Sequence, residues 1–104
     1  MSGSVTVEAH PRLEGVQVVT LDNPGKLNAM SVAMWNALRA HFEGLAVREP
    51  ALRAVILRGA GGSFVSGGDI AEFPAFRFRA DTLRHFHEEV VAPALEALWA
   101  CDVP

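Results

Sequence analysis

The chain has 104 residues, of which 50% are hydrophobic and 20% are charged, and this composition indicates one globular domain with a modest core and excludes a disordered chain. The formal net charge of −3 gives no basic surface for nucleic acid, and no apolar stretch is long enough to span a membrane, so we expect neither as a partner. Cys101 is the only cysteine and can form neither an internal disulfide nor a multi-cysteine metal site. The N-terminus lacks a basic start followed by an apolar run, so we expect a cytoplasmic protein.

The first two predicted elements are strands that form a hairpin. Residues 4–10 alternate between apolar and polar side chains, which is typical of a half-buried strand. Residues 15–21 are richer in β-branched side chains and form the second strand. Pro11 and Gly15 bracket the turn between them, so an antiparallel pair begins the domain.

A loop at residues 23–30 and a helix follow. The loop begins with NPG at residues 23–25, which suits a type II turn because proline and glycine fit its two central positions. Ser31 is a good N-cap for the helix. Gly44 weakens the last turns, and we expect the helix to end before Pro50. Apolar residues at helical spacing form the buried stripe of this helix: Met34, Leu38, Phe42 and Leu45.

Residues 54–57 form a short, continuous apolar run, which predicts a strand covered on both faces, as in parallel sheets. A strand, a helix and another strand in this order make a βαβ crossover, expected to be right-handed. In open sheets of this kind, ligands bind beyond the carboxyl ends of the strands. We therefore expect the loop at residues 23–30 and the loop after this strand to lie side by side and form one pocket.

The loop at residues 59–69 holds five of the nine glycines in the chain. Such density indicates unusual backbone angles or the close approach of a ligand, such as an oxyanion or a phosphate bound by backbone N–H groups. The loop is not a Walker phosphate loop, since no Gly-Lys-Ser/Thr occurs, and Phe64 replaces the third glycine of a dinucleotide fingerprint. A ligand-facing role and a plain connection between a strand and a helix both stay open.

A short helix and a long helix are predicted after this loop. Asp69 and Glu72 have capping-box spacing for a short helix that starts at Ile70, and a catalytic acid or base role is the alternative for these carboxylates. Asp81 can cap a final helix that runs to about residue 100. Pro93 should kink or divide that helix. Its apolar stripe comprises Leu83, Phe86, Val90, Ala94 and Leu98.

Other candidate side chains have simpler explanations. His85 and His87 lie two positions apart and so do not share a helix face that could hold a metal. Cys101 has no activating base nearby in sequence and fits a small buried residue. We therefore expect no bound metal. A basic cluster fits either the phosphates of a ligand or a solvated helix face: Arg77, Arg79 and Arg84.

Three segments, in order, resemble the crotonase superfamily of enoyl-CoA hydratases and isomerases. Residues 15–21 followed by residues 22–31 (DNPGKLNAMS) resemble the family's first strand pair and the loop after it. Residues 52–61 (LRAVILRGAG) resemble its next strand, and residues 64–70 (FVSGGDI) resemble its oxyanion loop. Each motif is weak by itself, whereas the three in this order with family-like spacing are specific. The resemblance implies an α/β fold, namely the N-terminal part of a crotonase-like ββα spiral with a βαβ crossover and a C-terminal helix.

The resemblance also implies a pocket for a coenzyme A thioester. The N–H of Gly68 would be one of two donors of an oxyanion hole that stabilises an enolate. The family often has alanine where Gly68 stands and, where Ala71 stands, a lysine that can meet a CoA phosphate. Coenzyme A would be part of the substrate, with no permanently bound cofactor. The residues implied to line the coenzyme A site are Lys26, Leu27, Asn28, Ala29, Ser66, Gly67, Gly68, Asp69 and Ile70.

The family's second oxyanion glycine and its catalytic carboxylates follow a strand that begins around Pro104. We therefore expect residues 1–104 to be the N-terminal portion of a crotonase-like domain, incomplete and nearly inactive by itself. The implied activity is that of an acyl-CoA hydratase or isomerase in fatty acid metabolism, with acyl-CoA as the small-molecule partner. The alternative is a truncated, non-catalytic CoA-binding or assembly fragment. The resemblance also admits a homo-oligomer, trimeric or hexameric as in the family.

Overall fold

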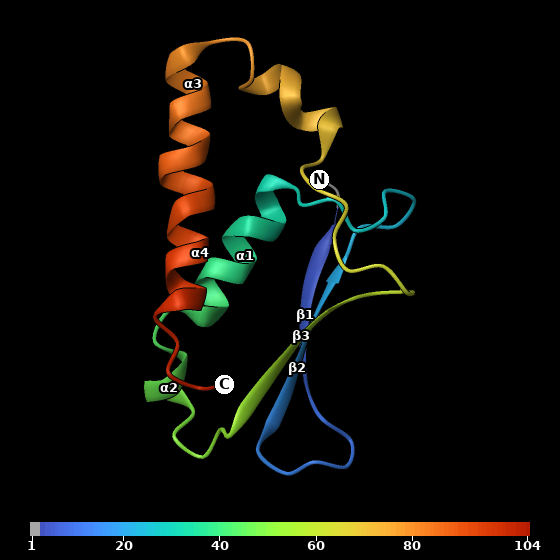
Figure 1. The fold of residues 1–104 in the computed structure, drawn as a ribbon, viewed down its shortest axis with the longest axis vertical. Coiled ribbons are helices and arrows are strands. Elements are labelled where there is room, and N and C mark those ends of the chain that lie inside the picture. Colours follow the sequence, from blue (N-terminus) through green and yellow to red (C-terminus); the bar gives the residue numbers. More distant parts are fainter. Residues whose placement is uncertain (1–2) are drawn as a thin grey trace.

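The computed structural model describes residues 3–104, as a small sheet with helices packed against it. Figure 1 shows α3 and α4 as one long rod beside α1, with the strands on the other side of α1. The predicted α/β class, with a hairpin, a crossover and a C-terminal helix, is confirmed. The elements are the strands β1 (Ser4–Ala9), β2 (Val16–Asp22) and β3 (Ala54–Gly59), the helices α1 (Val32–Phe42), α2 (Leu45–Arg48), α3 (Ala80–His85) and α4 (Ala92–Trp99), the 3-10 helix η1 (Ile70–Ala75) and the π-helical segment η2 (Phe86–Val91).

The sheet has the strand order β1-β2-β3, so β2 is its central strand. β2 pairs with β1 in antiparallel register, with Ser4 opposite Asp22, and with β3 in parallel register, with Val16 opposite Ala54. The parallel pair is joined through α1 and α2, which is the predicted βαβ crossover. This central position explains why residues 18–21 of β2 are all buried.

The edge strand β3 is less buried than its sequence predicts. Val55 and Leu57 pack against the core, whereas Ile56 on the opposite face is 40% exposed. The expectation of cover on both faces is wrong, because the helices of the described chain pack on one face of the sheet (Figure 1). At the open edge the Val55 N–H donates to the Pro104 carbonyl at 2.8 Å, so the residues after α4 return to the sheet.

The core lies between the covered sheet face and helix α1. The Ser31 hydroxyl accepts a hydrogen bond from the Met34 N–H at 3.1 Å, which confirms the predicted N-cap. Helix α1 ends at Phe42, and Gly44, with a φ of +70°, begins the separate helix α2. The single helix that we expected is therefore divided at this glycine. The buried core cluster contains Val19, Leu21, Met30, Met34, Leu38, Phe42 and Leu45, which includes the whole predicted stripe.

The C-terminal rod stays helical through Pro93, and its irregular turn is η2, just before the proline. In this turn the Ala92 N–H donates to the carbonyl of His87, five residues earlier, as in a π-helix. A proline has no N–H to donate, so a wider turn at this point accommodates it without a break. Val90 and Ala94 from the predicted apolar stripe are buried. The rod therefore packs its predicted face on the domain although its hydrogen bonding is not α-helical throughout.

Candidate functional site

The loops that follow β2 and β3 lie side by side, as the sequence predicts. We call them together the loop junction, which comprises residues 23–31 and 59–69. The Met30 N–H donates to the Gly67 carbonyl at 2.7 Å and the Asp69 N–H donates to the Met30 carbonyl at 3.0 Å, which makes a parallel bridge between Met30 and Gly68. A residue between two such bonds directs its own N–H to the other side. Within the described chain the Gly68 N–H has no acceptor, and Gly68 is exposed.

Asn28 fastens the two halves of the loop junction to each other. Its side-chain amide donates to the carbonyls of Ala60 and Ser63 at 2.8 and 3.0 Å, and its side-chain oxygen accepts from the Asn23 N–H at 3.0 Å. Asn28 is buried and has a φ of +58°, a left-handed conformation that asparagine adopts more readily than most residues. One side chain thus bonds three backbone groups, of which the Asn23 N–H is buried and the two carbonyls are partly buried.

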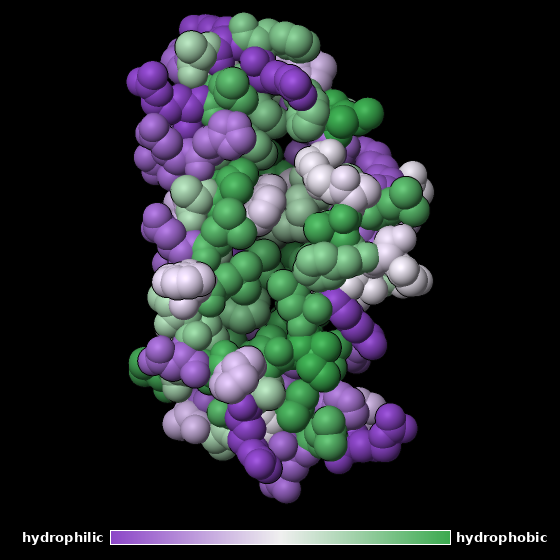
Figure 2. Space-filling view, viewed as in Figure 1, coloured by the Kyte–Doolittle hydropathy of each residue, from purple (hydrophilic) through white to green (hydrophobic). Residues whose placement is uncertain are grey.

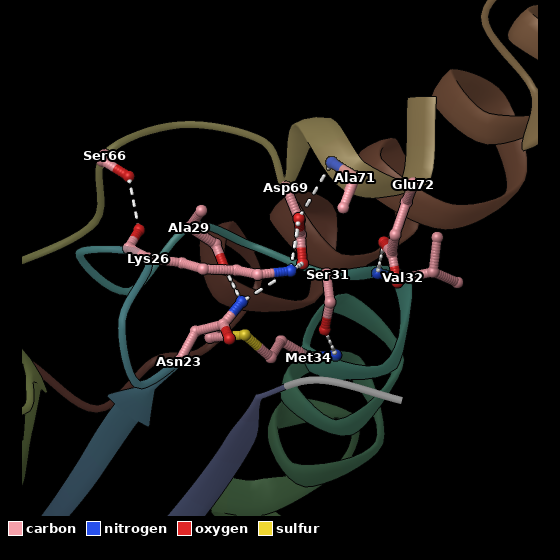
Figure 3. A network of polar contacts seen from close by, with 10 residues as sticks. All are labelled: Asn23, Lys26, Ala29, Ser31, Val32, Met34, Ser66, Asp69, Ala71 and Glu72. Carbon is pink, nitrogen blue, oxygen red and sulfur yellow. Dashed lines mark hydrogen bonds and ion pairs between the residues drawn. The ribbon is translucent and has the colours of Figure 1, made fainter. Parts of the chain in front are cut away.

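A buried ion pair makes a second connection across the loop junction (Figure 3). The Lys26 ammonium lies 3.0 Å from the Asp69 carboxylate, and the two side chains are 36% and 1% exposed. The same carboxylate accepts from the Asn23 side chain at 3.4 Å and from the Ala71 N–H at 3.1 Å. Asp69 therefore caps η1, as predicted, and also binds a lysine that lies 43 residues earlier in the chain. Asp69, which follows Gly68 directly, is therefore fixed by contacts with Lys26, Asn23 and Ala71.

Glu72 has a different role from the one that its spacing predicts. Its carboxylate accepts a hydrogen bond from the Val32 N–H at 2.8 Å, at the start of α1 (Figure 3). The capping-box expectation is wrong, because the Asp69 N–H that such a carboxylate would reach already donates to Met30. Glu72 instead supplies an acceptor to another helix N-terminus, where free N–H groups favour a negative charge. The contact ties η1 to α1.

Gly59, the last residue of β3, is required by close packing. A methyl group added at this glycine would collide with the carbonyl oxygens of Ser63 and Phe64. Both atoms belong to the backbone and cannot turn aside as a flexible side chain could. The glycine therefore lets the chain fold back on itself directly after the strand and brings the following loop toward Asn28.

A cavity of about 490 Å³ opens beside Gly68, between α1, η1 and the C-terminal rod. Figure 2 shows hydrophobic residues along the middle of this side of the molecule, with hydrophilic residues along its outer edges. Among the side chains that line the cavity in the described chain, none is a carboxylate. Its lining comprises Trp35, Gly68, Phe73, Phe76, Arg77, Leu83, Phe86, His87 and Val91. The free N–H of the loop junction thus lies next to an apolar space.

The remaining residues implied to line a coenzyme A site differ in exposure. Leu27 and Ile70 are 68% and 75% exposed, and Leu27 has a φ of +49°, which is unusual for a bulky side chain. Ser66 is exposed, and its hydroxyl donates to the Lys26 carbonyl at 3.1 Å. Ala29 is buried within the loop junction, as are Asn28 and Asp69. The surface that a ligand can touch is therefore formed by the two aliphatic side chains, by Ser66 and by the backbone of Gly67 and Gly68.

The cavity itself is the part of the site that the sequence patterns missed. Its aromatic lining combines Trp35 from α1 with Phe73 from η1, Phe76 directly after η1 and Phe86 from the C-terminal rod. The apolar stripes identified Phe86 as a packing residue, and Trp35 lies beside the stripe of α1. The available signal was the density of phenylalanine after residue 72, at positions 73, 76, 78 and 86.

The basic cluster separates into three different environments. Arg77 lines the cavity and lies over the Phe73 ring, 4.9 Å from its centroid. Arg79 pairs with Asp81 at 3.1 Å on the surface and is the N-cap residue of α3. Asp81 is therefore in the first turn of that helix, and the expectation that it is the cap is wrong. Arg84 is exposed, as a solvated helix face requires.

His41 lies at the other end of α1, away from the loop junction. Its Nε2 atom is 2.6 Å from the side-chain oxygen of Gln17. Burial lowers the pKa of His41 below its ordinary value of 6.5, the Arg48 guanidinium lowers it further, and Glu49 opposes both. The imidazole therefore serves as a neutral donor to Gln17 at neutral pH.

Residues 3–104 offer neither a metal site nor a membrane-spanning helix. No group of three or more histidine, cysteine or carboxylate side chains there is arranged to hold a metal ion. None of the helices in this part of the chain has the length and apolar character needed to cross a membrane.

Sequence comparison with known proteins gives a family profile and two relatives whose descriptions all name enzymes of CoA compounds. The sequence profile described as enoyl-CoA hydratase/isomerase matches residues 16–92. A probable enoyl-CoA hydratase of Rhodobacter capsulatus is 36% identical over 92 residues, which are 88% of this chain and 33% of that protein. The 3-hydroxyisobutyryl-CoA hydrolase 1 of Arabidopsis thaliana is 44% identical over 57 residues, which are 54% of this chain and 15% of that protein.

Solved structures give the same result for the fold. The crystal structure of an enoyl-CoA hydratase/carnithine racemase from Magnetospirillum magneticum superposes with a TM-score of 0.86 at 31% identity, over 98% of this chain and 38% of that one. The Pseudomonas aeruginosa protein AtuE superposes with a TM-score of 0.81 at 34% identity, over 95% of this chain and 37% of that one. The fold is thus the N-terminal part of a crotonase fold.

The chain belongs to the enoyl-CoA hydratase/isomerase family, because the family profile covers most of it and the structural neighbours agree. It spans about a third of the length of the Rhodobacter relative. Of the residues that carried the resemblance, those at positions 52–58 belong mostly to β3, and those at positions 23–31 and 59–70 form the loop junction and the start of η1.

Proposed function

We propose that the protein acts on acyl-CoA thioesters as a hydratase or isomerase of the crotonase type, with the Gly68 N–H as one donor of an oxyanion hole. One observation carries the proposal. The bridge between Met30 and Gly68 uses the flanking groups and leaves the Gly68 N–H without an acceptor in the described chain, beside an apolar cavity. Because Gly68 is exposed, a ligand oxygen can reach this donor.

The proposed chemistry uses that donor when charge develops on the thioester carbonyl. Removal of a proton from the α-carbon, or addition of water to the double bond, passes through an enolate whose oxygen is negative. A fixed N–H stabilises this oxygen without reorganisation, and the loss of one such donor typically costs roughly 3–4 kcal/mol in the barrier. The hydrogen bonds of Asn28 and the Lys26–Asp69 pair would hold the donor in place.

The coenzyme A part of the substrate would lie across the outer surface of the loop junction. Leu27 and Ile70 are exposed on either side of the glycines and offer apolar contact. Lys26 is bound by Asp69, and Ala71 has no charge, so neither supplies a free cation for a phosphate. We therefore expect backbone and apolar contacts to dominate in this chain. A trimeric or hexameric assembly stays a prediction.

The second candidate function is a CoA-binding fragment without turnover. The observation that favours it is the lining of the cavity, which holds no carboxylate among the described residues. Hydration needs acid and base groups within hydrogen-bond reach of the substrate. We expect, as the resemblance implies, that the hydratase or isomerase activity needs carboxylates that this lining does not hold, whereas binding of the thioester does not.

The test is binding of crotonyl-CoA to the 104-residue chain, with the carbonyl of the thioester labelled with carbon-13. Calorimetry measures affinity, and isotope-edited infrared spectroscopy measures polarisation of the carbonyl. We expect the bound carbonyl band to move to lower frequency, because a hydrogen bond to the oxygen weakens the C=O bond. The Gly68→Pro variant, which lacks the N–H, should lose this shift.

The matched control is Gly68→Ala, which keeps the N–H. Its added methyl group would lie 3.1 Å from Cε1 of Phe73, so a small movement of that ring accommodates it. The carbonyl shift should persist in this variant. No heat of binding at millimolar crotonyl-CoA or CoA contradicts the proposal, and substantial hydration of crotonyl-CoA by the 104-residue chain contradicts the need for further groups.

A further inference from the structure

The aromatic side chains beside Gly68 are organised as one continuous wall. The rings of Phe76 and Phe86 are stacked, with centroids 4.0 Å apart and planes inclined by 12°. The ring of Phe73 meets Phe76 edge to face, with centroids 5.8 Å apart. We call Phe73, Phe76 and Phe86 the aromatic wall. Because each ring touches the next, the three side chains form one continuous apolar surface that lines the cavity.

The wall is assembled from two separate elements, and one of them is irregular. Phe73 belongs to η1, whereas Phe86 is the first residue of η2. The π-helical segment also contributes His87 and Val91 to the cavity. Such segments are rare and occur frequently at functional sites, since the extra residue in the turn redirects side chains. Here the extra residue belongs to the segment that lines the space.

The wall begins at the proposed oxyanion donor. A methyl group at Gly68 would lie 3.1 Å from Cε1 and 3.3 Å from Cζ of Phe73, so that ring is in contact with the glycine. A thioester carbonyl bound at Gly68 would therefore place the first carbons of its acyl group against Phe73. Trp35, from α1, lines the same cavity.

We infer that this cavity selects acyl groups that carry an aromatic ring near the thioester, such as 3-aryl-propenoyl groups, and this inference rests on the proposed function. Its volume of about 490 Å³ lies within the range of cavities that hold drug-sized ligands, and a short acyl chain would leave much of it unfilled. Aromatic rings prefer offset-stacked or edge-to-face partners, and four aromatic side chains line the space. An aromatic ring on the acyl group would add a further ring contact to those within the aromatic wall.

The chemistry of the lining also disfavours other acyl groups. A cationic acyl group would meet the Arg77 guanidinium and, among the described lining residues, no carboxylate. An aliphatic chain of equal size would fill the volume but gain none of the directional contacts between rings. Short, aliphatic and aromatic acyl groups are therefore distinguishable by affinity.

The experiment compares the affinity of the 104-residue chain for four ligands by calorimetry. The ligands are CoA, crotonyl-CoA, 3-cyclohexylpropenoyl-CoA and 3-phenylpropenoyl-CoA, of which the last two have the same number of carbons. We expect 3-phenylpropenoyl-CoA to bind about threefold to tenfold more tightly than the cyclohexyl compound, and both to bind more tightly than crotonyl-CoA.

Location of the acyl ring is measured by fluorescence. The chain has two tryptophans, Trp35 in the cavity and Trp99, which is exposed. The Trp99→Phe variant leaves Trp35 as the only tryptophan, and its emission should be quenched by 3-phenylpropenoyl-CoA. Unchanged Trp35 emission with the ligand bound would place the ring elsewhere and overturn the inference.

Matched variants test the wall itself. Phe76→Leu keeps an apolar side chain and removes the ring, whereas Phe78→Leu makes the same change at an exposed position two residues away that is not part of the cavity lining. We expect the preference for phenyl over cyclohexyl to disappear in Phe76→Leu and to persist in Phe78→Leu. Circular dichroism shows that each variant is folded.

The outcomes separate this inference from the proposed function. Absence of binding by all four ligands contradicts the proposed function. Binding of all three thioesters with equal affinity leaves the proposed function standing and overturns the inference, as does an equal preference for phenyl in Phe76→Leu and the unmodified chain. A preference for phenyl that depends on Phe76 supports it.

Discussion

The loop junction and the aromatic wall meet at Gly68, and they are held together by opposite kinds of interaction. The loop junction is fastened by buried hydrogen bonds and an ion pair, in which Asn28 and Asp69 each serve several partners. The wall is held by ring contacts of Phe76, directly after η1, with Phe73 of η1 and with Phe86 of η2. Hydrogen bonds are directional and fix a donor closely, whereas apolar contacts tolerate small shifts. The structure thus combines a rigid position for the proposed oxyanion donor with a space that other side chains could reshape.

The largest expected effect is that of Asn28→Ala. The change removes three hydrogen bonds and leaves the carbonyls of Ala60 and Ser63 and the Asn23 N–H without this partner. We expect a loss of about 3 kcal/mol or more in the free energy of unfolding, measured by urea denaturation. Asn36→Ala, on the exposed face of α1, is the control and should change it by less than about 0.5 kcal/mol. Equal effects of the two variants would contradict the role given to Asn28.

The next effect is that of Lys26→Met, which leaves the Asp69 carboxylate buried without its cation. Asp69 retains bonds from Asn23 and Ala71, and Lys26 is partly exposed, so we expect about 2 kcal/mol of destabilisation rather than the full cost of breaking a buried pair. Arg39→Met breaks the exposed pair with Glu43 and should cost about 0.5 kcal/mol or less. Unfolding in urea at low and high salt measures both. A Lys26 variant as stable as the Arg39 variant would show that the ion pair does not fasten the junction.

A smaller effect on stability is expected in the aromatic wall. Phe86→Leu removes the stacked ring but keeps an apolar side chain, so we expect a loss of about 1 kcal/mol. The amide NMR signal of Gly68 should hardly move in this variant, whereas Asn28→Ala should displace it. Phe78→Leu serves as the exposed control. Displacement of the Gly68 signal by Phe86→Leu to the same extent as by Asn28→Ala would remove the distinction between the two regions.

The smallest effect concerns His41, which lies outside both regions. Burial and Arg48 lower its pKa in the folded chain below the value of 6.5 that an unfolded chain has. Between these two pKa values the unfolded chain binds more protons, so the stability rises as pH rises through this window and levels off above about 6.5. His41→Gln should flatten this rise, as measured by urea denaturation across the window, and His85→Gln, on an exposed residue, should not. A steeper rise in His41→Gln would contradict the direction of the pKa shift.

Local sequence patterns predicted most of the secondary-structure elements. The features that they did not predict depend on contacts between residues far apart in the chain. The strands, the Ser31 cap and the side-by-side loops follow from alternation, capping chemistry and the parallel crossover. The division at Gly44 and the π turn before Pro93 were signalled as weak points, but whether a helix breaks or widens depends on packing. Sequence spacing placed Glu72 in a local capping box, whereas the observed acceptor role is toward Val32, 40 residues earlier.

For the candidate site, too, the sequence predicted the local features and not the contacts between distant residues. The resemblance identified the glycines around Gly68, and the structure adds the free N–H and the connections that hold it. The Lys26–Asp69 pair joins residues 43 positions apart, which no periodicity reveals. The cavity needed the structure for the same reason, because its aromatic side chains come from α1, from η1 and the turn after it, and from η2, and only the tertiary fold brings them together.

The π-helical turn sets the rotational phase of the two halves of the C-terminal rod. The wider turn takes up one extra residue, so removal of one residue within η2 would restore ordinary winding and leave α3 and α4 in the same rotational phase. Successive residues of a regular helix turn by about 100°, so the same deletion within α3 or α4 would instead rotate one half by that angle and turn Leu83 away from the cavity, while the buried Ala94 on α4 stays in the core. The turn is therefore the place in the rod where related chains can lose one residue without exchanging the wall of the cavity.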